Sequence, residues 1–425
     1  MRRPAVPAAL RVPLFRRIWL AGFVSTIGDW MQIVGRGFLV YDITGSKSAL
    51  GLVYFASYIP QLLLTPFGGV FADRLDRRRT LLGGQVAQTV LAVALGLLAG
   101  TGEATLTGVV LISLAAGTVQ TMTMPAQMAL TPSLVPPDVL PSAMSLGMTT
   151  NNLSRVVGPG LAGLLIRNYG VEWVFHVNAL SFLAVIAAWL ITRVPALPER
   201  LQQTTLAAMA EGWRHVRSTP ALMLPIALVG VLAAIGLSYQ TLGIAYVTDV
   251  LARGNDALGA RYYGTFQAVV GFGGIVGIAS LAPRGRRAPG STLILTAVGF
   301  SLGLVALGFV RRPLLAFALC FVIGIFHFAN SNLVLTLVQR AAPDPMRGRV
   351  MSILLVAWIG IFPITSLFIG TIATRTSIKA VFVGAGLICL AASLIAARWR
   401  HVVGEADETP EADARVPLVT ASEEA

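Results

Sequence analysis

The chain is 425 residues long, 55% of its residues are hydrophobic, 12% are charged, and its mean hydropathy is +0.75. Two or three soluble domains of this total length would carry a larger share of charged residues. The composition therefore excludes a soluble enzyme and predicts a polytopic membrane protein. The formal net charge of +13 also occurs in nucleic-acid-binding proteins, but its distribution along the chain favours another explanation.

Apolar runs of about 20 residues, each long enough to cross a hydrocarbon core of ~30 Å, recur along almost the whole chain. Backbone polar groups inside lipid must pair with one another, and the runs lack the alternating pattern of barrel strands, so we expect helices. The sequence therefore predicts an all-α membrane protein with twelve transmembrane helices. We expect these helices near residues 18–41, 49–72, 80–101, 105–128, 142–167, 171–192, 221–247, 259–282, 291–310, 313–338, 350–374 and 377–398.

The 32 lysines and arginines are distributed unevenly between the two ends of the predicted helices. If the N-terminus is cytoplasmic, 22 of them lie in cytoplasmic segments and eight lie in loops on the outer side. This bias follows the positive-inside rule, predicts that both termini are cytoplasmic, and explains the net charge without a nucleic-acid partner. The outer eight are Lys47, Arg167, Arg253, Arg261, Arg311, Arg312, Arg375 and Lys379.

The two halves of the chain repeat one another with a nearly constant register. Gly117 and Gly324, for example, are 207 residues apart and begin similar segments of the fourth and tenth helices. A parallel repeat about the membrane normal produces such a register. We therefore expect two pseudo-symmetric six-helix bundles, formed by residues 18–192 and 221–399.

Three further segments lie outside the predicted bundles. Residues 1–17 are expected to form a cytoplasmic arm. The linker 193–220 contains a stretch with one apolar and one charged face, which predicts a short helix at the cytoplasmic membrane surface. Residues 400–425 are rich in Asp and Glu, so we expect a disordered acidic tail in the cytoplasm.

A charged turn separates the second and third predicted helices. Its notable residues are Gly69, Asp73, Arg74, Arg77 and Arg78. The turn resembles the G-x-x-x-D-R-x-G-R-R signature of the major facilitator superfamily, with Asp76 in the place of the second glycine. The resemblance implies a transporter whose inner gate is locked by charge pairing of this turn. The alternative is a turn that only keeps this loop on the cytoplasmic side of the membrane. That role would explain the arginines but not the acid among them.

Ionisable side chains in the middle of a membrane are costly, so each needs a reason. On the first helix, Asp29 lies ~18 Å along the axis from Arg17, close to the bilayer centre. Arg36 follows on nearly the same face, with Gln32 nearby. Because Asp29 and Arg36 are ~10 Å apart along the axis, we expect each to contact water, substrate or another helix. We predict that these residues line a substrate and proton pathway; a buried polar clamp is the alternative.

The fifth helix combines a central charge with a glycine–proline motif. Arg155 lies near the bilayer centre and does not lose its proton, so we expect it to offset the charge of Asp29 or to bind an anionic group. It precedes Gly158, Pro159 and Gly163, which resemble the G-P-x-x-G motif of exporter branches of the same superfamily. Proline bends a helix and glycine permits close helix approach, so the motif suits packing or hinge motion.

The fourth, seventh and tenth helices also carry polar residues near the bilayer centre. They are Gln120 and Thr123, Tyr239 and Gln240, and His327 and Asn330, respectively. The resemblance implies that helices 1, 4, 7 and 10 line the central cavity, which would place these residues in the substrate and proton pathway. Histidine titrates near neutral pH, so His327 is a candidate proton relay; a satisfied interhelical hydrogen bond is the alternative.

Residues 28–30, 39–46 and 178–182 are similar to the enterobactin-exporter-like branch of the superfamily, which holds bacterial drug and siderophore exporters. The resemblance implies a monomeric secondary transporter in a bacterial inner membrane that exports small amphipathic molecules in exchange for protons. The implied partners are the lipid bilayer, the substrate and protons, with the proton gradient as energy source and no cofactor. The arginine that many drug:proton antiporters carry on helix 4 is absent from residues 105–128.

Two other functions stay open at this point. One is transport of a lipid or lysophospholipid by the same fold, and the other is a membrane scaffold or sensor that has lost transport. Enzyme chemistry has the least support, because the sequence contains no phosphate-binding loop and no convincing catalytic constellation. Cys320 and Cys389 lie inside predicted helices, so we expect neither a metal site nor a disulfide.

Overall fold

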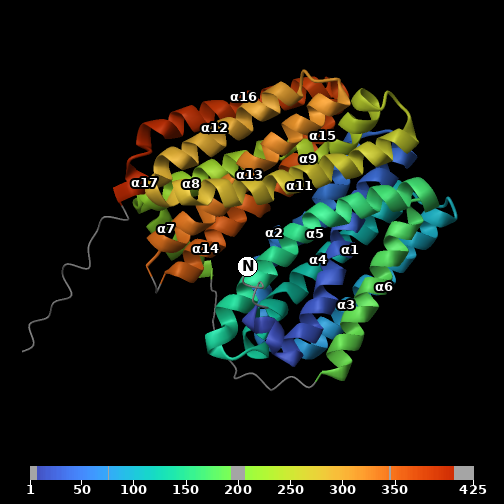
Figure 1. The fold of residues 1–425 in the computed structure, drawn as a ribbon, viewed down its shortest axis with the longest axis horizontal. Helices are drawn as coiled ribbons and strands as arrows, with labels where there is room; N and C mark the ends of the chain where they lie inside the picture. The colour runs from blue at the N-terminus through green and yellow to red at the C-terminus, as the bar shows by residue number, and fades with distance from the viewer. Residues whose placement is uncertain (1–6, 75, 193–205, 344–345, 406–425) are drawn as a thin grey trace, which may run out of the picture.

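The computed structural model describes residues 7–74, 76–192, 206–343 and 346–405. All regular structure among these residues is helical, and the helices form two bundles (Figure 1). One bundle contains the first half of the chain, in blue to green, and the other contains the second half, in lime to red. The predicted all-α architecture of two helical bundles is therefore confirmed.

The N-terminal bundle consists of six long helices joined by short connections. They are α1 (Pro13–Thr44), α2 (Lys47–Arg74), α3 (Arg77–Gly100), α4 (Leu106–Leu130), α5 (Leu140–Tyr169) and α6 (Glu172–Ile191). Short 3-10 turns precede α1 and link α4 to α5, namely η1 (Ala8–Arg11), η2 (Thr131–Leu134) and η3 (Pro137–Val139).

The C-terminal bundle also makes six passes, but two of its passes are interrupted. The first comprises α8 (Pro220–Val231), η4 (Leu232–Gly236), α9 (Ser238–Thr241), α10 (Gly243–Ala245) and η5 (Tyr246–Leu251). It is followed by α11 (Asp256–Arg287), α12 (Pro289–Leu307) and α13 (Pro313–Ala341). The fifth pass comprises α14 (Arg347–Leu355), η6 (Val356–Gly360) and α15 (Phe362–Arg375), and α16 (Ile378–Ala396) is the sixth. The interruptions η4, η5 and η6 are π-helical turns, which often lie at functional sites.

Nine helical segments of the described chain are long and apolar enough to cross a membrane, which is compatible with the twelve expected spans. The nine do not include α1, α2 and α5, and the side chains of residues 65–74 of α2 lie outside the described residues. Polar side chains such as Asp29 and Gln32 on α1, and Asn151 and Arg155 on α5, lower the hydropathy of these two helices. Of the three helices that are missing from the nine, α1 and α5 are therefore those that carry central charges.

We call the end of the bundles that carries Ala8 and Glu405 the termini face, and the opposite end the distal face. At the termini face, the Ala9 amide donates to Ser142 Oγ over 3.3 Å. The short helices η7 (Ala397–Trp399) and α17 (Val402–Glu405) follow α16, and α17 packs on α8 and α12. Both ends of the described chain therefore lie on the same side of the bundles.

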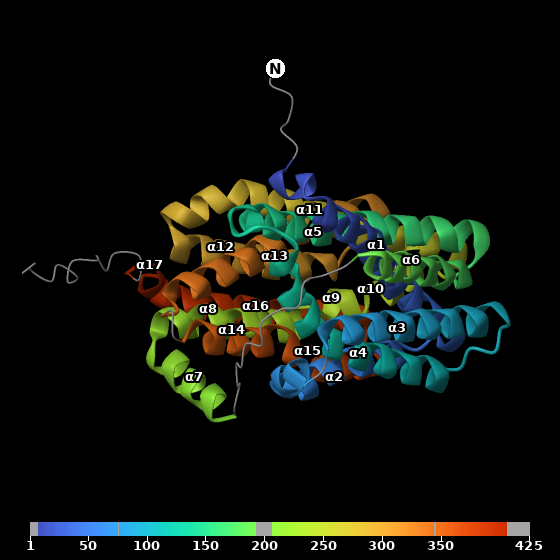
Figure 2. The ribbon, with the colours of Figure 1, turned by 90° about the horizontal axis from the view of Figure 1, so that it is seen from below.

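The linker helix α7 (Leu206–Ser218) also lies at the termini face, beside α14 and α8 (Figure 2). Its Glu211 forms an ion pair with Arg349 on α14 over 2.6 Å, and its Val216 is fully buried. The helix is therefore packed on the C-terminal bundle. The first part of the predicted linker, residues 193–205, lies outside the described residues.

A set of polar contacts, which we call the distal seal, joins the two bundles at the distal face. Asp249 of the C-terminal bundle accepts a hydrogen bond from Tyr41 Oη over 2.6 Å and pairs with Lys47 Nζ over 3.2 Å. Nearby, the hydroxyls of Ser48 and Thr374 lie 3.3 Å apart. One carboxylate thus holds two side chains of the opposite bundle.

Backbone contact between helices of opposite bundles lies behind the distal seal. A Cβ atom on Gly264 of α11 would lie 2.8 Å from the Pro159 carbonyl of α5, and one on Gly163 would lie 3.2 Å from the Ala260 carbonyl. In the second crossing, between α2 and α15, a Cβ on Gly370 would lie 2.5 Å from the Lys47 carbonyl. At Gly264 and Gly370 only glycine permits the approach, and a side chain at Gly163 would require its neighbour to shift. Pro159 and Gly163 of the helix-5 motif therefore pack one bundle against the other, whereas Gly158 packs α5 on α1 of the same bundle.

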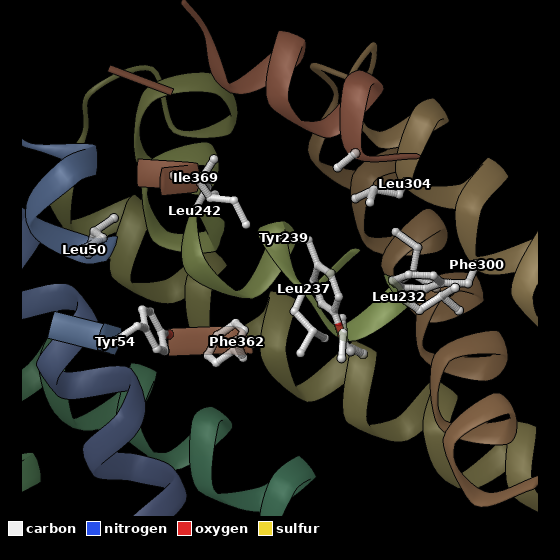
Figure 3. Packing of buried hydrophobic residues seen from close by; sticks show 14 of the residues in the cluster. Leu50, Tyr54, Leu232, Leu237, Tyr239, Leu242, Phe300, Leu304, Phe362 and Ile369 are labelled. Atoms are coloured by element: carbon white, nitrogen blue, oxygen red, sulfur yellow. The ribbon is translucent and has the colours of Figure 1, made fainter. Parts of the chain in front are cut away.

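Buried apolar residues continue across this junction (Figure 3). The ring of Tyr54 on α2 meets the ring of Phe362 on α15 edge to face, with centroids 5.9 Å apart. Leu50 on α2 and Leu242 and Ile369 of the C-terminal bundle belong to the same cluster. The distal halves of the two bundles therefore share one hydrophobic core.

Toward the termini face the two bundles diverge, as their spread in Figure 1 indicates. Met144 and Met148 on α5 are 48% and 56% exposed, and a Cβ on the neighbouring Gly147 would have nothing within 4 Å. On α11, which crosses α5 further along, Phe272 is also exposed. The structure is closed at the distal face and open toward the termini face.

We predict that Gly264→Ala loosens the distal junction, because the new methyl group meets a backbone carbonyl that cannot move aside alone. Such overpacking costs ~1–3 kcal/mol, which should raise the population that is open at the distal face. Maleimide labelling of a cysteine introduced at Leu50, which is buried in the shared core of the closed distal junction, measures this opening. Gly160→Ala is the matched control, because a Cβ there has nothing within 4 Å. Equal labelling of both variants would contradict the assigned role of the crossing.

Candidate functional site

A cavity of about 690 Å³ runs through the N-terminal bundle toward the termini face. Its deep part is lined by Asp29 and Arg36 on α1 and by Tyr58 on α2. Its mouth is lined by Leu134 and Trp189, which lie near the start of α5 and the end of α6. All of its lining residues belong to the N-terminal half, so in this conformation the site is built by one bundle.

Side-chain amides dominate the polar lining of the cavity. They are Gln32, Gln61, Gln85, Gln88, Gln120, Gln127 and Asn151. Each amide both donates and accepts hydrogen bonds, so these residues create a polar surface that carries no charge. One of them, Gln88, is already engaged through a 3.0 Å bond from its Nε2 to the Ala116 carbonyl.

Aromatic rings make up much of the remaining lining, including Phe15, Trp19, Phe23, Trp30 and Tyr58. The rings of Trp19 and Phe23 stack with centroids 5.6 Å apart. Among the residues that the structure describes, Trp19 Nε1 and Gln85 Oε1 are buried without a hydrogen-bond partner. The hydroxyl of Thr150, which also lines the cavity, is likewise buried without a partner among the described residues. The cavity therefore offers flat apolar surfaces together with free donors and acceptors.

Asp29 and Arg36 contribute the charges predicted for this site, and they do not pair with each other in the described structure. The Asn178 amide donates to Gln32 Oε1 over 2.5 Å and also interacts with the Asp29 carboxyl group. Arg36 Nη1 makes a long contact of 3.4 Å with Ser57 Oγ. A carboxylate held by an amide rather than by a cation can gain or lose its charge without breaking an ion pair.

Arg155 lies beside the cavity in a sandwich of aromatic rings. Its guanidinium carbon lies 4.7 Å from the centre of the Trp30 ring on α1 and 4.2 Å from that of Phe328 on α13. Arg155 was expected to offset the negative charge of Asp29. It makes cation–π contacts instead, because two electron-rich ring faces occupy the space around the guanidinium. Its Nε is buried without a partner in the described part of the chain, so the residue keeps an unused donor.

The polar residues predicted on the seventh and tenth helices lie outside the lining of this cavity. His327 and Tyr239 are packed among rings, with Tyr239 6.2 Å and Phe300 5.3 Å from the His327 ring centre. Gln240 Nε2 donates to Tyr239 Oη over 3.2 Å. Asn330 Nδ2 donates to Thr296 Oγ1 over 2.9 Å within the C-terminal bundle. In this conformation these side chains contribute to packing.

The two residues predicted on the fourth helix have different surroundings. Gln120 is exposed and lines the cavity, as expected for a pathway residue. Thr123 is buried, donates to the Val119 carbonyl over 3.0 Å, and its methyl group fills the space beside Gly84 on α3. Thr123 therefore holds α4 against α3.

Gly69, Asp73 and Arg74 of the predicted gating turn belong to the last turns of α2, and Arg77 begins α3. The side chains of Asp73, Arg74 and Arg77 lie outside the described residues. Arg78 donates from Nη2 to the Trp189 carbonyl over 2.8 Å, which ties α3 to the end of α6.

The departure from the superfamily signature at Asp76 has a structural explanation. Asp76 Oδ1 accepts a 2.7 Å bond from the Arg79 amide and so caps the N-terminus of α3. A glycine lacks the oxygen that satisfies this amide. The departure therefore contributes to the start of the helix.

Several lining residues were not identified from the sequence, above all Tyr58, Gln61, Gln85 and Gln88. The available signal was the presence of glutamine inside otherwise apolar runs of the second and third helices. Helix rotation decides whether such a residue faces lipid, a neighbour or a cavity, and one sequence does not determine that rotation.

We predict that Arg155→Gln destabilises the protein by about 2 kcal/mol, since a buried cation–π contact contributes about that much. Thermal unfolding of the purified protein in detergent measures the loss. Arg155→Lys should retain part of the stability, because an ammonium group also binds ring faces. Arg167→Gln is the control, since Arg167 lies on the same helix but is exposed. If the Arg167 variant loses as much stability, the sandwich is not the cause.

Comparison with known proteins identifies the family. Residues 5–424 match the family described as transmembrane secretion effector. The enterobactin exporter EntS of Shigella boydii serotype 18 is 27% identical over 341 residues, which cover 80% of each chain. EntS of Escherichia coli O139:H28 is 26% identical over the same length and the same shares.

The following solved structures share the fold and are more distant in sequence. A bacterial homologue of the human lysosomal transporter Spinster, inward-facing and unoccupied, has a TM-score of 0.69 at 15% identity and covers 93% of this chain and 98% of its own. A mutant of the peptide transporter POT in complex with sulfate has a TM-score of 0.75 at 14% identity, with 95% and 97% covered. A bacterial homologue of the iron transporter ferroportin has a TM-score of 0.69 at 19% identity, with 94% and 100% covered.

These relatives are transporters and not enzymes, and the solved structures share the fold of this chain. The chain is therefore a multi-pass membrane transporter of the major facilitator superfamily and belongs to its transmembrane secretion effector family.

Proposed function

We propose that this chain is a secondary exporter of small amphipathic molecules, which works by alternating access and exchanges its substrate for protons. The observation that carries the proposal is a deep cavity open to the termini face behind a closed distal seal. Alternating access requires a site that is open to one side only, and this conformation has that property. Export as the direction is supported by the likeness to the enterobactin exporters.

The termini face is proposed to be cytoplasmic, in a bacterial inner membrane. The support is the concentration of basic residues in the segments on that side. With this orientation, the described conformation is the state that loads substrate from the cytoplasm. The substrate leaves when the bundles rock, the distal seal separates and the termini face closes.

The cavity lining favours an uncharged or weakly charged substrate with flat rings and hydrogen-bonding groups. The amides supply donors and acceptors in matched numbers, while Trp19, Phe23 and Trp30 supply flat apolar faces. A volume of about 690 Å³ is suited to a molecule of drug size. A strongly ionic substrate would lose its water without enough opposite charge to replace it.

Asp29 is proposed as the residue that couples substrate movement to protons. It is the carboxyl group in the cavity lining, and in the described structure no cation is paired with it. In the proposed cycle, Asp29 binds a proton when the cavity faces outward and releases it to the cytoplasm when substrate enters. Its amide neighbour Asn178, which also donates to Gln32, carries both a donor and an acceptor and so can bond to either form.

We predict that Asp29→Asn uncouples transport from the proton gradient, because the amide does not titrate. In vesicles that contain the purified protein, substrate-stimulated proton movement should fall to the background of empty vesicles. Glu103→Gln is the control, since Glu103 is an exposed acid in the connection between α3 and α4. Unchanged proton-driven efflux by the Asp29 variant would exclude this residue from coupling. Failure of wild-type protein to move any tested compound or proton would favour a scaffold instead.

We predict that Gln120→Leu weakens transport of substrates with hydrogen-bonding groups. Loss of one hydrogen bond of ~0.5–1.5 kcal/mol should raise the apparent KM about 2- to 10-fold and leave apolar substrates less affected. Accumulation assays in cells that lack their own exporters measure the difference. Thr118→Leu is the matched control, because Thr118 bonds to the Leu114 carbonyl of its own helix and does not line the cavity. Equal effects of both changes on every compound would contradict the assigned lining.

A further inference from the structure

The distal face contains a second cavity, distinct from the proposed substrate site. Its volume is about 630 Å³, and it lies among the connections between passes of the C-terminal bundle. Four basic residues line it, namely Lys47, Arg253, Arg311 and Lys379, against the one acid Asp249. The sequence places eight basic residues in outer loops, against the positive-inside trend. Four of these eight line this one cavity.

The single acid does not neutralise this charge, because it is already engaged. Asp249 pairs with Lys47 over 3.2 Å and accepts from Tyr41 over 2.6 Å. The other three basic side chains have no acid among the residues that line the cavity. Cations gathered in a concave space repel one another, and an anion placed between them relieves that repulsion.

Two of the basic residues are held in place by their surroundings. Lys379 Nζ lies 4.4 Å from the ring centre of Phe309, which also lines the cavity. Arg253 is in the left-handed backbone region, with φ of 54°, which is uncommon for a residue other than glycine. The neighbouring Gly254 continues the turn with φ of 81°. The ring contact orients the Lys379 ammonium group, and the left-handed turn sets the backbone position from which Arg253 extends; an oriented cation reduces the ordering cost of binding a ligand.

The cavity also contains donors that suit an oxyanion. Thr374, Thr376 and Ser377 line it, and Ile378 and Lys379 begin α16. Ser377 Oγ accepts from the Ala380 amide, so one amide of this helix start is already satisfied. The amides of Ile378 and Lys379 have no partner within the helix and carry the positive end of its dipole. Hydroxyls, amides and cations together bind phosphate oxygens in proteins.

We propose that this cavity binds a phosphate group, free or as part of an anionic lipid headgroup, and that binding stabilises the closed distal face. Lys47 is the residue of the N-terminal bundle in its lining, and every other lining residue comes from the C-terminal bundle. An anion held here therefore attracts both bundles across the distal seal. Because the site is complete only while the bundles touch, the ligand favours that conformation by its differential affinity.

Thermal unfolding of the purified full-length protein in neutral detergent tests the site, with inorganic phosphate titrated at constant ionic strength. The melting temperature of the wild type should rise with phosphate. The triple variant Arg253→Gln, Arg311→Gln and Lys379→Gln should bind about tenfold more weakly, as expected from the loss of three exposed charge contacts. Arg312→Gln is the matched control, because Arg312 is the neighbour of Arg311 and does not line the cavity.

A second measurement does not depend on the stability of the triple variant. Both native cysteines are buried, so a Thr376→Cys variant presents one accessible thiol at the cavity. Phosphate should slow its labelling by a charged maleimide, and chloride at equal ionic strength should not. The same labelling in nanodiscs of phosphatidylcholine, with and without phosphatidylglycerol, distinguishes a lipid headgroup from free phosphate.

Each outcome decides the proposal. Protection by phosphate, by phosphatidylglycerol or by both supports it and identifies the source, provided that the triple variant loses the effect and Arg312→Gln keeps it. Equal loss in Arg312→Gln means that diffuse surface charge is responsible and overturns the site. Absence of any response in the wild type overturns it as well. A response in Lys47→Gln equal to that of the wild type would overturn the link to the distal seal.

Discussion

Close backbone contact between the two bundles, at the crossings of α5 with α11 and of α2 with α15, is the constraint on which the rest of the structure depends. The crossings require glycine at positions such as Gly264 and Gly370, because a side chain there would meet a carbonyl group. They lie near the distal face, so they close that end and leave the other free to spread. The cavity, its opening and the distal seal all follow from where the helices touch.

The polar residues of the two bundles have different surroundings, although the sequences of the bundles repeat one another. The N-terminal bundle keeps its polar residues around a cavity, where amides and Asp29 contact open space. In the C-terminal bundle, the corresponding polar residues, such as His327, are packed among aromatic rings. Arg155 connects the two environments, since one ring of its sandwich comes from each bundle. A movement that separates the bundles must therefore expose this guanidinium or give it a new partner.

Charge is used differently at the two ends of the molecule. At the termini face, Glu211 on the linker helix holds Arg349 within one bundle. At the distal face, Asp249 joins the bundles through Lys47 and Tyr41, and the remaining cations there have no acid in the cavity lining. The first pair stays together when the bundles move apart, whereas the second must break. The distal face is thus where an external anion can influence the conformational equilibrium.

The sequence alone determined the fold class, the order of the helices and the two pseudo-symmetric bundles, because hydropathy and spacing along a helix depend only on neighbours in the chain. The same spacing predicts a central depth in the membrane for Asp29, Arg36 and Arg155. The sequence also indicated Gln32 and Gln120, which do line the cavity. The tertiary structure decided the rest: Asn330 and Thr123 bond within their own bundles, Arg155 lies between rings, and glutamines of α2 and α3 complete the site. The direction in which a polar side chain points depends on helix rotation and on partners far away in sequence, so no local pattern contains it.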